Sequence, residues 1–169
     1  MTTRGLLIGR FQPFHDGHAK LVEEVVDEVD ELIFGIGSAG DSHTVRNPFT
    51  AGERIMMATK SIEAMPFDTT VYTVPIEDLN RNSVWVSHVQ SISPRFDIAF
   101  SNNALVIQLF SEAGVEVRQT PMFDRDNLKG SAIRQMMVDG KNWESHVPEA
   151  VVEVVDEING IQRIQAISR

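Results

Sequence analysis

Two histidines near the N-terminus are spaced for chemistry on a phosphate. His15 and His18 stand three residues apart, so one helical turn would bring them to the same side of a helix. A helix that begins here offers unpaired backbone N–H groups and about half a positive charge to an anion. Arg10 could add a forked guanidinium, and Gly17 leaves room for a phosphate to approach. The segment therefore predicts a phosphate site; the ordinary alternative is a helix capped by Asp16, with both histidines exposed.

The charge of the chain limits what such a site can be. The 169 residues include 24 acidic and 15 basic side chains, which gives a net charge of −9. This charge excludes general binding to nucleic acid, which requires a basic surface. The overall field would also repel an anionic substrate, so the cations that bind it must be gathered locally.

Apolar runs and turn residues predict alternating strands and helices. Buried strands are expected at residues 5–11, 31–38, 70–78, 96–102 and 115–121. Helices are expected at 16–29, 50–65, 83–92, 103–112, 130–140 and 148–160. Thr50 and Glu53 form the pattern of a capping box, Gly114 is expected to close the fourth helix, and Pro148 suits a first helical turn. The alternation predicts an α/β fold, a Rossmann-like doubly wound parallel sheet with helices on both faces and two helices at the C-terminus, in one domain of residues 1–169.

The unusual polar residues follow the expected strands. They fall at residues 9–18, 38–46, 78–85, 101–103 and 123–134. Ligands of doubly wound sheets bind beyond the carboxyl ends of the strands. We therefore expect these segments to meet at one edge of the sheet and to form one site there.

The motif residues resemble a known family. The stretch "GRFQPFHDGH" resembles the signature of the HxGH nucleotidyltransferase superfamily, and its longer form is similar to that of archaeal nicotinamide-nucleotide adenylyltransferases. The stretch "KGSAIR", with Ser131 and Arg134, resembles the second signature of the superfamily. The resemblance extends to "IGSAGDSHTVRNPFTAGERIMM" and "PEAVVEVVDEINGIQRI". It implies transfer of AMP from ATP to nicotinamide mononucleotide (NMN), with NAD and pyrophosphate as products.

The implied reaction suits the residue types present. A phosphate monoester is mostly ionised near neutral pH, so NMN can attack directly and in line, with no general base and no covalent intermediate. The enzyme must hold two polyanions together and absorb charge on the leaving pyrophosphate. Arginines, imidazoles and helix N-termini perform this task, and Mg²⁺ or another divalent cation would be held by the substrate phosphates and water.

The resemblance also implies the residues of the site. Catalysis is assigned to His15, His18, Arg10 and Arg134. ATP is expected to contact Gly9, Arg10, Phe11, His15, Gly17, His18, Lys129, Ser131 and Arg134. NMN is expected to contact Ser38, Arg46, Asn82 and Trp85. The ordinary alternatives are a simple helix cap for Ser131 and a solvated connector for the segment around Arg46; the roles of His43 and Lys129 stay open.

Asn82 and Trp85 suit the nicotinamide end of the acceptor. An indole can stack on an electron-poor pyridinium ring, and an amide side chain can pair with a carboxamide. The ordinary alternative is that Trp85 packs in the core. Four other residues are expected to be structural: Arg54, His88, Trp143 and His146.

Two other functions compete with this prediction. One is another member of the superfamily with a different acceptor, such as pantetheine phosphate or FMN, or with cytidylyl transfer. The other is a regulatory module that binds nucleotide without catalysis. The sequence has no cysteine, no apolar run of about 20 residues and no recognisable signal peptide, so we expect a cytoplasmic protein with no membrane partner. The resemblance implies a homo-oligomer, and use of nicotinate mononucleotide stays open.

Overall fold

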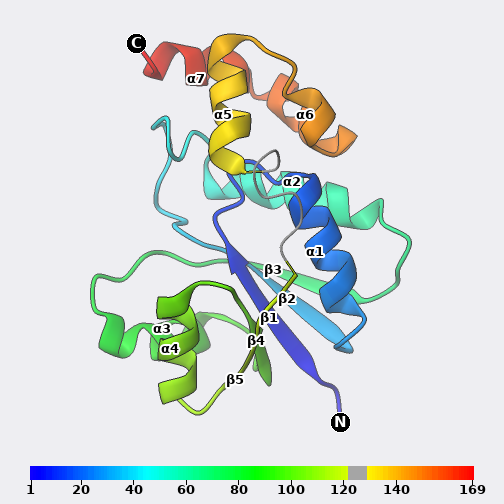
Figure 1. Ribbon diagram of the computed structural model, residues 1–169, viewed down its shortest axis with the longest axis vertical. Coiled ribbons are helices and arrows are strands. Elements are labelled where there is room, and N and C mark those ends of the chain that lie inside the picture. Colours follow the sequence, from blue (N-terminus) through cyan, green and yellow to red (C-terminus); the bar gives the residue numbers. More distant parts are fainter. Residues whose placement is uncertain (122–128) are drawn as a thin grey trace.

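The computed structural model describes residues 1–121 and 129–169, which form an α/β fold around one parallel sheet (Figure 1). Its strands are β1 (Arg4–Gly9), β2 (Glu31–Ile36), β3 (Thr70–Pro75), β4 (Ile98–Phe100) and β5 (Glu116–Arg118). Their spatial order is β3-β2-β1-β4-β5, and every neighbouring pair is parallel. The chain reverses direction across the sheet between β1 and β4, which is where such folds bind ligands. The predicted fold class is confirmed.

Helices cover both faces of the sheet and one end of it. One face is covered by α1 (Asp16–Val26) and α2 (Ala51–Glu63), and the other by α3 (Trp85–Ile92) and α4 (Ala104–Glu112) (Figure 1). Three helices lie beyond the sheet: α5 (Gly130–Asp139), α6 (Glu149–Glu157) and α7 (Gly160–Ile167). Short 3₁₀ helices span Asn82–Val84 and Glu144–His146. Within the described ranges, no helix combines the length and the apolar character needed to cross a bilayer.

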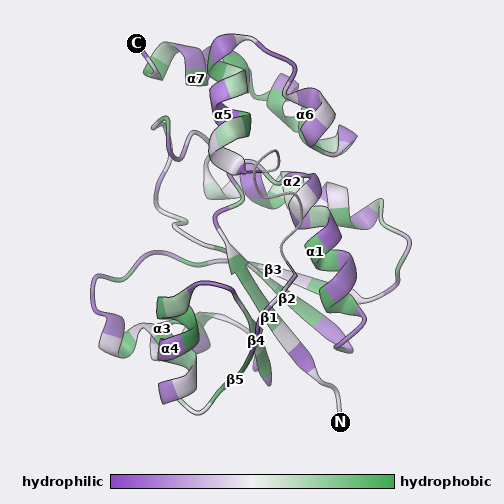
Figure 2. Cartoon of the chain, in the orientation of Figure 1, coloured by the Kyte–Doolittle hydropathy of each residue, from purple (hydrophilic) through white to green (hydrophobic). Residues whose placement is uncertain are grey.

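Two apolar cores hold the sheet between its helices. Leu6 and Ile33 pack toward α3 and α4, whereas Leu7, Leu32 and Phe34 pack toward α1 and α2. The central strands are therefore apolar on both faces, which explains their continuous apolar runs in the sequence. Figure 2 shows hydrophobic residues along these strands. The larger core continues into α5, α6 and α7, so the C-terminal helices are attached to the end of the sheet that carries the site.

The first and the last predicted helices differ most from the structure. The first helix ends at Val26 rather than residue 29, because the chain then turns and the Asp30 N–H bonds the carbonyl of Thr3 (2.9 Å). The predicted helix 148–160 is two helices, since Asn159 takes a left-handed conformation (φ 53°) that an asparagine tolerates. Pro148 precedes the first helical residue as the N-cap instead of lying within the turn.

Candidate active site

The two histidines form a reciprocal cap at the start of α1. Nδ1 of His15 accepts the backbone N–H groups of Gly17 (3.1 Å) and His18 (3.4 Å). Nδ1 of His18 in turn accepts the N–H of His15 (3.2 Å). The N-cap is therefore His15 and not Asp16, so the ordinary alternative for this segment is wrong.

This cap fixes the tautomer of both rings. Because each Nδ1 accepts a hydrogen bond, the proton of each neutral ring lies on Nε2. Burial, with a smaller effect of the Arg134 charge, lowers the pKa of His15 to about 4. Burial and the neighbouring His15 lower the pKa of His18 well below its ordinary value. Near neutral pH both rings are therefore uncharged, and each keeps one Nε2–H donor that the cap does not use.

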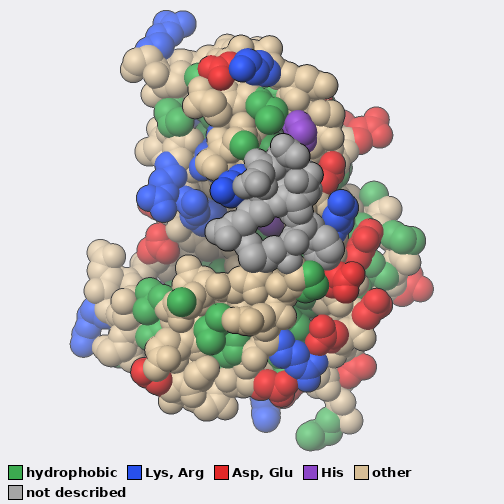
Figure 3. Space-filling model, in the orientation of Figure 1, with side chains coloured by type: hydrophobic (Ala, Val, Ile, Leu, Met, Phe, Trp, Pro, Cys, Tyr) green, Lys and Arg blue, Asp and Glu red, His purple; other side chains and the backbone are tan. Residues whose placement is uncertain are grey.

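Three arginines supply positive charge beside these rings. Burial, then the charges of Arg10 and Arg46, lowers the pKa of Arg134 to about 10. Burial and Arg46 also lower the pKa of Arg10. None of the three forms an ion pair with a residue in 1–121 or 129–169. Figure 3 shows lysine and arginine side chains gathered at mid-height on one side of the molecule, so an acidic protein concentrates positive charge locally.

The histidines and two of the arginines line one hollow of about 270 Å³. Its lining residues are Arg10, Phe11, Gln12, His15, His18, Lys129, Gly130, Ser131 and Arg134. Two segments more than a hundred residues apart therefore meet here, as the two sequence motifs predicted. The N-terminus of α5 opens on this hollow, and its N-cap is Lys129, so the simple cap expected as the alternative for Ser131 is wrong. Residues 122–128, which include the first six of the predicted segment 123–134, lie outside the described residues.

Gly9 and Gly17 do not line this hollow, although both were predicted to contact ATP. A Cβ at Gly9 would come within 2.8 Å of the Phe11 ring, so the missing side chain makes room for that ring. Phe11 itself is buried and stacks on Phe34, with ring centroids 4.1 Å apart. Contact of Gly9, Phe11 and Gly17 with ATP stays a prediction.

A second hollow, of about 330 Å³, lies beyond the ends of β3 and β4. Its lining residues are Asp78, Leu79, Asn80, Asn82, Trp85, Asn103, Leu105, Val106 and Leu109. Trp85 is half-buried and packs edge-on against Phe110, with centroids 5.4 Å apart, so it belongs both to the core and to the wall of the hollow. Asp78 lines this hollow and raises the pKa of Arg10, against the larger effects of burial and Arg46. The charges of Arg10 and Asp78, which line different hollows, therefore act on each other.

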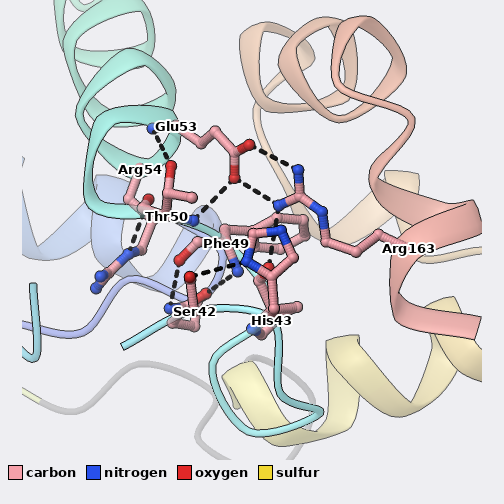
Figure 4. Close-up of polar contacts among 9 residues, drawn as sticks. Ser42, His43, Phe49, Thr50, Glu53, Arg54 and Arg163 are labelled. Atoms are coloured by element: carbon pink, nitrogen blue, oxygen red, sulfur yellow. Dashed lines mark hydrogen bonds and ion pairs between the residues drawn. The ribbon is translucent and has the colours of Figure 1, made fainter. Parts of the chain in front are cut away.

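Arg54 joins the backbones that carry Arg10 and Ser38. Its fully buried guanidinium donates to the carbonyl oxygens of Arg10 (2.7 Å), Gly37 (2.8 Å) and Ser38 (3.1 Å). Its Nε also donates to the carbonyl of Thr50 (3.2 Å), at the start of α2 (Figure 4). The structural role predicted for Arg54 is confirmed, and so is the packing role of Trp143, which is buried in the larger core.

Sequence reasoning missed Gln12. Its buried amide donates to the carbonyl of Phe49 (2.9 Å) and accepts the N–H of the same residue (3.0 Å). Its own carbonyl accepts a hydrogen bond from Arg134 (2.8 Å). A polar side chain set between Phe11 and Pro13 was the available signal, because such a residue must find partners when it is buried.

The segment that carries His43 and Arg46 is more exposed. Arg46 is exposed, and its charge acts on Arg10 and Arg134. The ring of His43 is exposed and bonds the hydroxyl of Ser42 (2.8 Å). Arg46 therefore belongs to the positive cluster, and a contact with NMN stays a prediction for it.

Comparisons with known proteins agree with this geometry. The model of the cytidylyltransferase-like family matches residues 6–136. The chain is 64% identical, over 98% of its length and 93% of the relative, to the nicotinamide-nucleotide adenylyltransferase of Halorubrum lacusprofundi. It is 52% identical to that of Methanocorpusculum labreanum, over 98% of both chains. A bifunctional NMN adenylyltransferase/ADP ribose pyrophosphatase from Francisella tularensis, solved with AMP and Mn ion, superposes with a TM-score of 0.80 at 20% identity, over 98% of this chain and 52% of that one, and this likeness shows the fold.

Proposed function

The chain belongs to the cytidylyltransferase-like family and, within it, to the archaeal nicotinamide-nucleotide adenylyltransferases, and we propose that it makes NAD and pyrophosphate from ATP and NMN. The observation that carries this proposal is the first hollow. Neutral Nε2–H donors, arginines that form no ion pair within residues 1–121 and 129–169, and the N-terminus of α5 converge there in a protein whose net charge is −9. Such a set binds a polyphosphate, and the adjoining hollow offers an aromatic ring and amides to a second substrate.

The chemistry needs little from the protein beyond position and charge. A phosphate oxygen of NMN attacks the α-phosphorus of ATP, the bond from that phosphorus to the bridging oxygen breaks, and pyrophosphate leaves with the electron pair. The attacking oxygen is already ionised near neutral pH, so no side chain has to remove a proton. Two neutral imidazoles suit this reaction, because they donate hydrogen bonds without taking a proton from either substrate.

The residues of the first hollow divide between reacting and leaving groups. His18 and His15 donate from Nε2 to the phosphate at which charge develops. Arg134 and the first turn of α5 bind the pyrophosphate part, with Arg10 between the two substrates. Phosphate oxygens that enter the first hollow relieve the mutual repulsion of the arginines. The cluster therefore binds most strongly the phosphate groups that carry the most negative charge.

The second hollow would hold the nicotinamide end of NMN. Trp85 offers an aromatic face to the pyridinium ring, and Asn82 offers both a donor and an acceptor to the carboxamide. Arg46 and Ser38, on the loop after β2, would bind the NMN phosphate. Because Asp78 of this hollow acts on Arg10 of the other one, the acceptor phosphate can lie close to the ATP phosphates.

Mg²⁺ or another divalent cation would accompany ATP. The described residues contain no group of three or more His, Cys, Asp or Glu side chains that could hold a metal ion. We infer that the phosphates and water supply most of its ligands, as Mg²⁺ prefers in nucleotide sites. When bound, the ion would neutralise phosphate charge, while the residues of the first hollow orient the triphosphate of ATP.

The test is a panel of acceptors given to the purified protein. With ATP and Mg²⁺, we expect NMN to give equal amounts of NAD and pyrophosphate, measured by chromatography and by a pyrophosphate assay. Turnover of pantetheine phosphate or FMN, with NMN inactive, would overturn the choice of acceptor. Tight binding of ATP without release of pyrophosphate under any acceptor would overturn catalysis itself.

A further inference from the structure

We propose that Arg163, on the C-terminal helix α7, is a positioning residue for the loop that carries Arg46, and so sets the affinity for NMN. The proposal rests on the function given above, in which this loop binds the acceptor phosphate. Arg163 touches neither hollow, and it acts through the backbone of the loop that it holds.

Arg163 is bound by three hydrogen bonds at the beginning of α2. Its Nη1 and Nη2 donate to Oε2 (2.7 Å) and Oε1 (2.8 Å) of Glu53, and Nη1 also donates to the carbonyl of Pro48 (3.1 Å) (Figure 4). The exposed fractions of the two charged side chains are 18% and 16%, so the pair is mostly shielded from solvent. Both partners are more than a hundred residues away in the sequence.

Glu53 is itself fixed by the cap of α2. Its carboxylate accepts the N–H of Thr50 (2.8 Å), and its own N–H bonds the hydroxyl of Thr50 (3.2 Å). Burial alone would raise the pKa of Glu53, but the hydrogen bonds from Arg163 and Thr50 outweigh burial and lower that pKa. The carboxylate is thus an ionised anchor on a fixed helix end, and Arg163 spans from this anchor to the loop.

The loop is held at three consecutive residues by two parts of the chain, the segment after β1 and helix α7. Asn47 accepts a hydrogen bond from Arg10 (3.4 Å), Pro48 from Arg163, and Phe49 is paired on both backbone groups with Gln12. Two of these contacts come from the segment after β1, which is part of the first hollow. Only the contact to Pro48, among these three, comes from the C-terminal helices.

Arg46 immediately precedes these three residues. Its exposed side chain has no ion pair with a described residue, so its position depends on the backbone that follows it. Removal of Arg163 frees Pro48 and weakens the contact of Asn47 with Arg10. The ATP-binding residues keep Arg54 and Gln12 as supports, so the effect should fall on NMN rather than on ATP.

The experiment compares Arg163→Gln with Glu53→Gln and with Arg4→Gln, a matched control. Arg4 also forms a partly buried pair, with Glu31, but at the amino ends of β1 and β2, away from the site. For Arg163→Gln we expect the KM for NMN to rise about fivefold to tenfold, with the KM for ATP and kcat changed by less than about threefold. Glu53→Gln retains a residue suited to the capping box and should raise the KM for NMN in the same sense. Arg4→Gln should lower the melting temperature without moving either KM.

The outcomes separate this inference from the proposed function. If wild-type protein makes NAD but Arg163→Gln alters only the melting temperature, or raises both KM values equally, Arg163 is merely structural and the inference fails. If wild-type protein makes no NAD, the proposed function fails first. In the double variant Arg163→Gln/Glu53→Gln, the rise in the KM for NMN should be smaller than the product of the two single effects. Both substitutions break the same contact, the one between Arg163 and Glu53. If the two effects on KM multiply, Arg163 and Glu53 act independently, and the inference that they hold the loop together is contradicted.

Discussion

The imidazole rings of His15 and His18 lie parallel, with centroids 3.5 Å apart and an interplanar angle of 19°, while each Nδ1 accepts the backbone N–H of the other residue. Two stacked rings cannot both carry a proton without strong repulsion, and burial also disfavours the charged form. The pair therefore does two things at once: it caps α1, and it directs two uncharged N–H donors away from the backbone.

The pH dependence of stability should report this arrangement. The folded pKa of His15 is about 4, below the ordinary 6.5, so the unfolded chain binds more protons between these values. Stability should then rise with pH through this window and be fully present above about pH 6.5, with at most about 1.4 kcal/mol per pH unit from this group. His15→Asn keeps a good N-cap and cannot titrate. Between pH 7.5 and pH 5, the free energy of unfolding measured in urea should fall less for the variant than for the wild-type protein. An equal fall in both proteins would contradict the low pKa of His15.

The amide variants of His18 test which nitrogen matters. Glutamine can place an amide donor near the position of Nε2, whereas the amide of asparagine reaches only the position of Nδ1, where the cap needs an acceptor. We expect His18→Ala to lower kcat by roughly 10²–10³, the range for loss of one donor to a transition state, with the affinity for NMN little changed. His18→Gln should retain more activity than His18→Asn. A near-normal kcat for His18→Ala would show that the end of α1 does not act on the reacting phosphate.

ATP should stabilise the fold through the arginine cluster. In the free protein Arg10, Arg46 and Arg134 repel one another, and a bound polyphosphate removes that repulsion. ATP at a hundred times its Kd should add about 2.7 kcal/mol, which is roughly 5–10 °C in melting temperature for a chain of this size. Arg134→Gln should lose most of this shift. Arg118→Gln, which breaks exposed pairs on β5 with Glu28 and Glu116, should keep it.

Substitution of Trp85 should change the affinity for NMN and leave the affinity for ATP unchanged. Trp85→Ala removes the aromatic wall of the second hollow, and we expect the affinity for NMN to fall about tenfold, the scale of a partly desolvated cation–π contact. Because Trp85 also packs on Phe110, Trp85→Phe serves as the variant that keeps an aromatic ring there. Calorimetric titration with NMN, and the KM for ATP as an internal control, measure the effect. Unaltered NMN affinity would remove Trp85 from the pocket.

The sequence predicted what local pattern and strand order determine. The apolar runs of β1 and β2, the capping box of Thr50 and Glu53, and the polar segments after each strand are short-range signals, and the parallel sheet then brings these segments to one edge. The convergence of the segments around His15 and Arg134 could be predicted because two motifs indicated it, although the contact itself spans more than a hundred residues.

Contacts without a local signal could not be predicted. Arg54, Gln12 and Arg163 each bind backbone carbonyls of other segments, and nothing in their own neighbourhood indicates which carbonyls. The reciprocal cap of α1 had no signal by residue type, because Asp16 is the better cap on that ground; His15 nevertheless takes the extended conformation that the position requires (φ −135°, ψ 176°). The division between α6 and α7 depends on a left-handed Asn159, one of several conformations open to asparagine in a short sequence window.

The charge of the second hollow predicts a choice between two acceptors. Nicotinate mononucleotide differs from NMN by a carboxylate in place of the carboxamide. Asp78 lines the hollow, and its described lining residues include no lysine, arginine or histidine that could pair with that carboxylate. We therefore expect kcat/KM to favour NMN by at least about tenfold, or 1.4 kcal/mol, since the acid form would meet a like charge and find no cation.

Asp78→Asn should narrow this preference by raising kcat/KM for nicotinate mononucleotide more than for NMN. Asp41→Asn is the matched control, because both aspartates act on the pKa of Arg10 but only Asp78 lines the hollow. Any effect that passes through Arg10 should appear in both variants as a change in the KM for ATP, whereas a change in acceptor preference should appear in Asp78→Asn alone. Equal use of both acceptors by the wild-type protein would mean that the carboxamide binds elsewhere, since a carboxylate beside Asp78 with no partner cannot bind as well as an amide.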